Sequence, residues 1–285
     1  MNQLQKHFSA SLIALAALLS AAPMASAAPA SSLSTFAILS AAPGHAGAVT
    51  LTNSTIVGDV GSSGVVTNTG STINGSIIAP VSANVVKDFN AALAAGLATT
   101  CTDTTTLQPA YAGPTEALTL TPGVYCINTA SGLTFTNTTL FLNGPSTASW
   151  TFIISGAGGL TGTDFKVVMA DGSAVPCDAV TWYVAQAATL TTSNFVGTIY
   201  AGAAITITGG TFNGDALAGG AVTTTGATVN GCTSTKHHSQ SKCNQGVGNG
   251  YEGCDPGNSD QGNPFNSNDE LGGVPGDPGR KGGNK

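Results

Sequence analysis

The feature that most constrains the fold is a sequence unit that occurs three times between Ala188 and Cys232. Each copy contains an apolar residue, Thr-x-Thr, a short turn, an aromatic or β-branched residue and then x-Gly. The copies lie 17 residues apart and begin at Ala188, Ile205 and Val222. A fixed short period that is rich in Gly, Thr, Ser and Asn and alternates like a strand predicts a solenoid of stacked short strands. Each copy is expected to form one coil.

Thr-x-Thr copies also occur earlier in the chain. Two begin at Val49 and Val66, again 17 residues apart, and looser copies begin at Leu118, Leu133 and Leu160. Around the last two of these the spacing lengthens to 27 and 28 residues, so those coils are expected to carry loops. All eight copies predict an all-β chain.

Charged residues make up only 8% of the chain, and their distribution excludes one class of partner. Between Ser31 and Asn230 the basic residues are Lys87 and Lys166 alone. Nucleic-acid binding requires clustered Lys and Arg, so it is not expected there. The hydrophobic share of 41% is nevertheless sufficient for a buried core.

Residues 1–27 have the pattern of a secretory signal peptide. Lys6 lies in a short polar head, an apolar run covers Leu12–Leu19, and small residues end in Ala-Ser-Ala. The apolar run is too short to span a membrane. We therefore expect a secreted monomer that begins near Ala28 and is released or loosely attached to the cell surface, with an uncleaved anchor as the alternative.

The six cysteines are expected to form disulfides, because export takes the chain into an oxidising compartment. Fifteen connectivities are possible, and the simplest joins neighbours in the sequence. Its pairs are Cys101 with Cys126, Cys177 with Cys232, and Cys243 with Cys254. There is no Cys-x-x-Cys, and the histidines have no ligand spacing to any cysteine, so we expect neither a metal site nor a cofactor.

One segment, from Val81 to Ala98, changes to a helical period. Its apolar residues recur at spacings of three and four: Val85, Val86, Phe89, Leu93, Gly96 and Leu97. This pattern predicts an amphipathic helix that lies along the side of the solenoid. A membrane-surface helix is the alternative, but such helices are usually rich in Lys and Arg, and this one contains only Lys87.

From Thr233 to Lys285 the chain is dominated by Gly, Asn, Pro and Asp. So few large apolar residues cannot bury a core, and residues 233–285 are expected to form a mostly disordered tail after a solenoid domain at 28–232. A calcium loop at Asp255–Asn263 is the alternative, but its spacing does not match Asp-x-Asx-x-Asx-Gly.

Thr-x-Thr also indicates a surface. Strand alternation sends the central residue inward and both threonines outward. Threonines would then lie about 6.6 Å apart along a strand and about 4.8 Å apart between strands, in a grid that can hold water in an ice-like arrangement. The uninterrupted copies supply Thr189, Thr191, Thr206, Thr208, Thr223 and Thr225. The alternative is that Thr simply favours a half-exposed strand.

Several motifs, together with a helix inserted after two coils, resemble the microbial ice-binding protein family that contains domain of unknown function 3494. They are Phe36–Ser40, Leu118–Tyr125, Thr151–Ile154 and Phe195–Ala201, and the resemblance covers about Leu33 to Cys232. It implies a right-handed parallel β-helix of triangular cross-section with one long helix packed alongside. It also implies a secreted protein that binds ice. The second face departs from a flat Thr-rich pattern, with Val57, Asn74, Val196 and Asn213 before the glycines.

Three other functions are alternatives for a solenoid of this kind. Polysaccharide-cleaving β-helices need paired carboxylates, or a calcium ion with Arg or Lys, close together on one face. Asp59 and Asp215 could share a face, but no Arg precedes Arg280. We therefore expect no enzyme activity. Trp150 and Trp182 lie in apolar runs and are expected in the core, not in a sugar site. A non-catalytic adhesin or matrix protein remains the runner-up.

Overall fold

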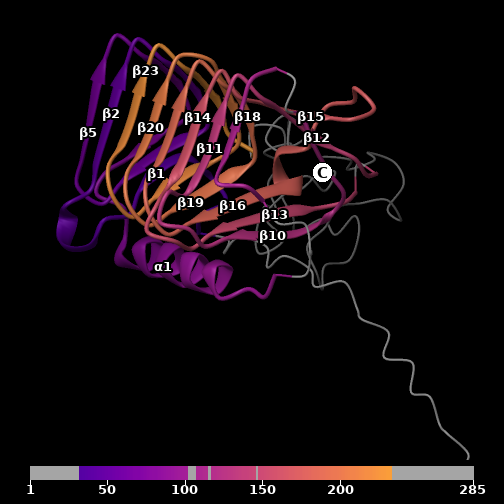
Figure 1. The fold of residues 1–285 in the computed structure, drawn as a ribbon. Coiled ribbons are helices and arrows are strands. Elements are labelled where there is room, and N and C mark those ends of the chain that lie inside the picture. Colours follow the sequence, from indigo (N-terminus) through magenta and orange to yellow (C-terminus); the bar gives the residue numbers. More distant parts are fainter. Residues whose placement is uncertain (1–31, 102–106, 115–116, 146, 233–285) are drawn as a thin grey trace, which may run out of the picture.

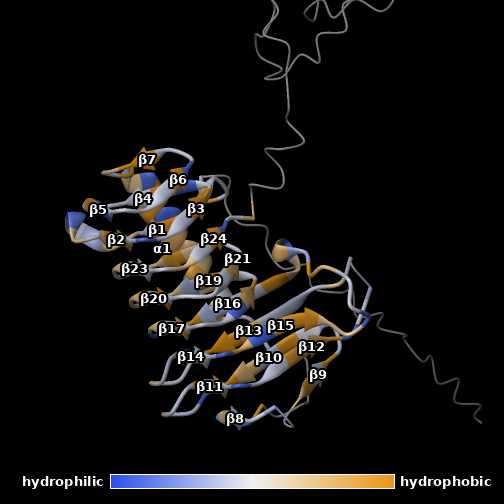
Figure 2. Cartoon of the chain, turned by 90° about the horizontal axis from the view of Figure 1, so that it is seen from above, coloured by the Kyte–Doolittle hydropathy of each residue, from blue (hydrophilic) through white to orange (hydrophobic). Residues whose placement is uncertain are grey.

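The computed structural model describes residues 32–101, 107–114, 117–145 and 147–232, which form a parallel β-solenoid with three sides. Each side is an eight-stranded parallel sheet, and each full coil contributes one strand to each sheet (Figures 1 and 2). This confirms the predicted three-sided solenoid. The expected signal peptide at 1–27 and the expected tail at 233–285 lie outside the described residues.

We name the three sheets A, B and C and give their strands in order along the stack. Sheet A contains β10 (Gly123–Ile127), β13 (Trp150–Ile154), β16 (Val180–Val184), β19 (Thr198–Ala201), β22 (Ala216–Ala218), β1 (Phe36–Ser40), β4 (Asp59–Ser62) and β7 (Ile77–Ile78). In the same direction, sheet B contains β8 (Ala110–Ala112), β11 (Leu133–Thr136), β14 (Leu160–Thr163), β17 (Ala188–Thr191), β20 (Ile205–Thr208), β23 (Val222–Thr225), β2 (Ala48–Thr52) and β5 (Val65–Thr69). Sheet C contains β9 (Leu118–Leu120), β12 (Thr139–Leu142), β15 (Lys166–Met169), β18 (Asn194–Val196), β21 (Thr211–Asn213), β24 (Thr228–Asn230), β3 (Thr55–Val57) and β6 (Thr72–Asn74).

The order of the coils in the stack differs from their order in the sequence. β1 lies between β22 and β4, β2 pairs with β23, and β3 pairs with β24. The two N-terminal coils therefore continue the stack beyond the C-terminal coil, as the indigo and orange strands in Figure 1 show. Two short 3-10 helices, Pro43–His45 and Cys177–Ala179, lie in the connections.

The core inside the three sheets contains a column of stacked aromatic rings. Trp150 and Trp182 are both fully buried, and Trp182 stacks on Phe152 with ring centroids 3.9 Å apart. The indole N–H groups donate to the backbone carbonyl oxygens of Leu120 at 3.2 Å and Val196 at 3.3 Å. Because their polar atoms are satisfied inside, both tryptophans belong to the core, as predicted.

Helix α1 (Ala83–Leu97) packs along sheet A, where it contacts β13, β16 and β19. Its N-terminus is capped by Ser82, whose side chain accepts a hydrogen bond from the backbone N–H of Val85. Phe89 and Gly96 are buried against the sheet. The apolar side of the helix thus packs on the solenoid, as predicted, and no helix of the described residues is long and apolar enough to cross a membrane.

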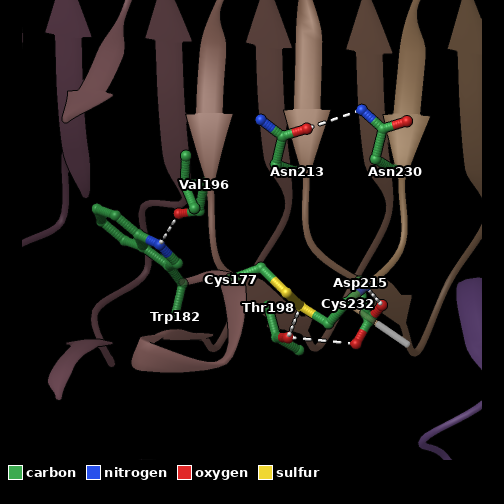
Figure 3. The surroundings of a disulfide bond; sticks show 8 residues. All are labelled: Cys177, Trp182, Val196, Thr198, Asn213, Asp215, Asn230 and Cys232. Carbon is green, nitrogen blue, oxygen red and sulfur yellow. Dashed lines mark hydrogen bonds between the residues drawn. A yellow bond between two sulfur atoms is a disulfide. The ribbon is translucent and has the colours of Figure 1, made fainter. Parts of the chain in front are cut away.

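Two disulfides fasten irregular segments to the stack, and both pairings are those predicted. Cys101, in the segment after α1, is bonded to Cys126 on β10, with Cα atoms 5.8 Å apart. Cys177, before β16, is bonded to Cys232 at the end of the last coil, with Cα atoms 5.5 Å apart (Figure 3). The predicted third pair, Cys243 with Cys254, lies outside the described residues.

Candidate functional site

Sheet B carries two straight rows of outward threonines, which come from seven of the eight Thr-x-Thr copies. The eighth copy, which begins at Leu118, lies on β9 in sheet C and does not join these rows. Their partners in the sheet are in exact strand register from β11 to β5. The first row contains Thr134, Thr161, Thr189, Thr206, Thr223, Thr50 and Thr67, and the second contains Thr136, Thr163, Thr191, Thr208, Thr225, Thr52 and Thr69. All fourteen are half-buried or exposed, and we call them the threonine face.

The six threonines predicted from the sequence lie at the middle of this face. The other eight come from the looped coils of β11 and β14 and from the N-terminal coils of β2 and β5. Seven strands at about 4.8 Å give the face a length of about 29 Å. The 17-residue period indicates that the N-terminal copies form coils, but it does not predict that these coils lie beside the C-terminal coil.

The residues between the threonines form a mostly apolar layer that supports the face. Leu51, Phe135, Leu190 and Ile207 point into the core and are fully buried or nearly so. Thr224 lies at the same position on β23 and is 0% exposed, and its hydroxyl has no hydrogen-bond partner among the described residues. Close packing of this layer restricts movement of the strands that carry the face.

A regular corner connects sheet B to sheet C and fixes one edge of the face. The residue after each second-row threonine has positive φ, from +47° at Asn53 to +69° at Gly70. Its N–H donates to the carbonyl oxygen of the next coil's second-row threonine, as Asn137 does to Thr163 at 2.8 Å and Gly209 does to Thr225 at 2.8 Å. The coils are therefore locked in register at this edge.

Buried hydroxyls strengthen the same corner. The side chains of Ser54, Thr138 and Ser193 each donate to the backbone carbonyl oxygen two residues earlier, at 2.9, 2.9 and 3.0 Å. The Ser54 hydroxyl also accepts from the backbone N–H of Ala227, in the neighbouring coil. These bonds satisfy polar groups that burial would otherwise leave without partners.

Sheet A cannot present a similar continuous surface, because α1 packs on its strands β13, β16 and β19. Tyr183 and Tyr200 point outward from β16 and β19 and are buried with Phe89, and the rings of Tyr183 and Tyr200 stack with centroids 5.2 Å apart. Burial, together with the nearby Tyr183 and Asp215, raises the pKa of the Tyr200 phenol well above its ordinary value. Sheets B and C are the two sides that α1 leaves uncovered.

The two acidic residues considered for catalysis have structural roles. A carboxylate oxygen of Asp59 accepts from the backbone N–H of Ser76 at 2.8 Å, and Asp215 accepts from that of Cys232 at 2.9 Å. Each carboxylate thus holds the next coil. β1 lies between β4, which begins at Asp59, and β22, which follows Asp215, so these two strands are about 9.6 Å apart. Within the described part of the chain, no three His, Cys, Asp or Glu side chains group as a metal site.

Comparison with known proteins assigns the chain to a family. The family model described as Ice-binding-like matches residues 31–230. No curated protein sequence matches significantly. An ice-binding protein of the Antarctic ascomycete Antarctomyces psychrotrophicus has 27% identity and a TM-score of 0.57, and covers 70% of this chain and 96% of its own. An ice-binding protein from an Antarctic biological consortium has 31% identity and a TM-score of 0.55, and the match covers 70% of this chain and 89% of that protein.

A third solved structure, an ice-binding protein of an Arctic yeast, has 24% identity and a TM-score of 0.57 and covers 70% of this chain and 92% of its own. At that identity the likeness shows the fold alone. The family match covers the segment that forms the solenoid and α1, and it agrees with the resemblance seen in the motifs. This chain belongs to the Ice-binding-like family.

Proposed function

We propose that this protein binds ice and that the threonine face is the surface that contacts it. The observation that carries the proposal is the pair of seven-membered threonine rows in continuous register on a side that α1 leaves uncovered. Membership of the Ice-binding-like family and the ice-binding neighbours support ice as the ligand.

The physical argument concerns repetition. Ice presents the same water positions many times over, so a protein surface binds it well only if its own groups repeat at fixed positions. Each threonine offers a methyl group and a hydroxyl that both donates and accepts, and β-branching restricts the side chain at χ1. Repeats of about 4.8 Å across the strands and about 6.6 Å along them are of the order of the water repeats in ice.

Rigidity and low charge also favour this surface. Neither row contains a charged side chain, so the face does not hold water in the orientations that an ion imposes. The buried layer and the corner hydrogen bonds hold the threonines in place before any contact with ice. Binding to a preorganised surface avoids the entropy cost of ordering it at that moment.

The wider proposal is a secreted, non-catalytic monomer with a solenoid domain at 28–232 and a tail at 233–285. Two disulfides among the described residues fit an oxidising compartment. Structural roles for Asp59 and Asp215 support the absence of catalysis. An adhesive or matrix role on an extended surface is the alternative that the following experiment separates from ice binding.

The test is growth of single ice crystals in solutions of the purified protein and of two variants. Thr206→Tyr places a bulky ring at the middle of the threonine face, and Thr119→Tyr makes the same change at an exposed position on β9 in sheet C. Wild type and Thr119→Tyr should arrest or facet the crystals, whereas Thr206→Tyr should lose this effect with an unchanged circular dichroism spectrum.

Two results would contradict the proposal. Round crystals that grow freely in concentrated wild-type protein would exclude ice binding and leave the adhesive role. A Thr206→Tyr variant that shapes crystals as the wild type does would show that another surface makes the contact.

A further inference from the structure

Sheet C contains a second regular surface, at the end of the stack where the N-terminal coils join the C-terminal ones. Four consecutive strands, β21, β24, β3 and β6, read Thr-Phe-Asn, Thr-Val-Asn, Thr-Ile-Val and Thr-Ile-Asn. Their register aligns Thr211, Thr228, Thr55 and Thr72 in one row and Asn213, Asn230, Val57 and Asn74 in the other. We call these eight residues the Thr-Asn patch.

The side chains of the patch point outward. The central residues Phe212, Ile56 and Val229 are buried in the core, and all eight patch residues are half-buried or exposed. Four strands at about 4.8 Å give the patch a length of about 14 Å. It is thus about half as long as the threonine face.

One side-chain hydrogen bond fixes part of the second row. The amide nitrogen of Asn230 donates to the amide oxygen of Asn213 at 2.8 Å, and Figure 3 shows the two side chains facing each other across neighbouring strands. This bond fixes the directions in which the Asn213 amide nitrogen can donate and the Asn230 amide oxygen can accept. These two members of the row therefore present oriented donors and acceptors.

The pattern ends where sheet C continues toward β9. The next strands carry Asn194, Lys166 and Thr139 at the first-row position. At the second-row position they carry Val196, which is buried, and then Val168 and Phe141. A charge and a large ring interrupt the repeat, so the regular surface is confined to four coils.

In these four coils the patch meets the threonine face at a corner with little relief. The corner residues are Gly209, Gly226, Asn53 and Gly70, so three of the four have no side chain. Both surfaces therefore remain open up to the edge that they share. As two sides of a three-sided solenoid, they are inclined to each other and cannot lie on one flat plane together.

We propose that the Thr-Asn patch is a second ice-contacting surface, and that the protein uses it and the threonine face to bind two different sets of ice planes. This inference rests on the proposed function. The Thr-Asn patch depends on the order of the coils in the stack. Thr55 and Thr72 lie next to Thr228 only because the N-terminal coils pair with the C-terminal coil.

The experiment is to adsorb fluorescently labelled protein to a single ice crystal and record which planes are labelled. The variants are Thr228→Tyr in the patch, Thr206→Tyr in the threonine face and the two combined, with Thr119→Tyr as the control on the far part of sheet C. Wild type and control should label two sets of planes. Each single variant should lose one set, and the double variant both.

A second patch variant, Thr72→Tyr on the terminal strand β6, removes dependence on how Thr228→Tyr folds, and circular dichroism checks each protein. The inference is overturned if both patch variants label the same planes as wild type, while loss of planes in Thr206→Tyr would still uphold the threonine face. It is also overturned if the single variant Thr206→Tyr labels no plane, because the intact Thr-Asn patch would then not bind ice by itself. A wild-type protein that labels no plane would overturn the proposed function as well.

Discussion

The variant Thr224→Val should be more stable than the wild type, because it removes a buried hydroxyl. Thr224 is 0% exposed and lies between Leu51 and Ile207 in the inward row of sheet B, where its hydroxyl has no hydrogen-bond partner in the part of the chain that the structure describes. A buried polar group without a hydrogen bond costs about 1–3 kcal/mol, because its bonds to water are lost and not replaced. Valine replaces that hydroxyl with a methyl group of similar size and also favours strands.

The free energy of unfolding should therefore rise by about 1–3 kcal/mol. In a domain of this size, a gain of about 2 kcal/mol corresponds to a rise in Tm of about 4–8 °C. Urea unfolding followed by tryptophan fluorescence measures the first quantity, and calorimetry measures the second.

Thr225→Val is the matched control, since it makes the same change one residue later on an exposed side chain. Its stability should stay within about 0.5 kcal/mol of the wild type. Equal or lower stability of Thr224→Val would refute the reasoning, because it would mean that the hydroxyl is satisfied in the folded protein.

Three further predictions concern the contacts that hold α1 and the coils together. Gly96→Ala should lower the free energy of unfolding by about 1–3 kcal/mol despite the better helix propensity of Ala, because a Cβ there would lie 2.1 Å from ring atoms of Tyr183. A variant that is more stable in urea than the wild type would contradict this close contact. Replacing Cys101 and Cys126 with Ser should cost about 3 kcal/mol by releasing a loop with a sequence separation of 25, and non-reducing mass mapping of the wild type should recover the two peptides joined. Because the pKa of Tyr200 is raised in the folded protein, the unfolded chain loses the phenol proton near pH 10.0 while the folded chain keeps it. The free energy of unfolding should therefore fall as the pH rises above that value. Tyr200→Phe removes this effect and should unfold at a higher pH in an alkaline titration.

The local parts of the fold could be predicted because they depend on period and alternation alone. A 17-residue repeat places equivalent residues one above another, and strand alternation then sets which side each residue faces. These two rules place Thr189, Thr206 and Thr223 in one row, as the structure does. The spacing of three and four in α1 likewise identified the side of the helix that packs on sheet A.

The order of coils could not be predicted in this way, because it depends on contacts between distant segments. The Ser54 hydroxyl bonds to Ala227 across 173 residues, and no local pattern signals which coil will meet which. The state of the Thr224 hydroxyl could not be predicted either. Strand alternation indicates that the side chain points inward, but not whether its hydroxyl makes a hydrogen bond. The sequence therefore predicted the middle of the threonine face but not its two ends, and whether this face contacts ice stays a prediction.

A variant on an N-terminal coil tests whether that coil belongs to the site. Thr50 lies far from Thr223 in the sequence, yet the two are neighbours in the first row of the threonine face. Thr50→Tyr should impair shaping of ice crystals as Thr206→Tyr does, because a ring at either position prevents a flat lattice from approaching the same row. Its side chain points outward, so stability should change by only about 0.5 kcal/mol.

The comparison with Thr206→Tyr gives this prediction its force. If both variants lose activity while Thr119→Tyr keeps it, the N-terminal coils extend the ice-contacting surface that the C-terminal copies begin. If Thr50→Tyr shapes ice as the wild type does and Thr206→Tyr does not, the contact stops before β2. The ten threonines of β11, β14, β17, β20 and β23 would then be a better description of the site than the full face of fourteen.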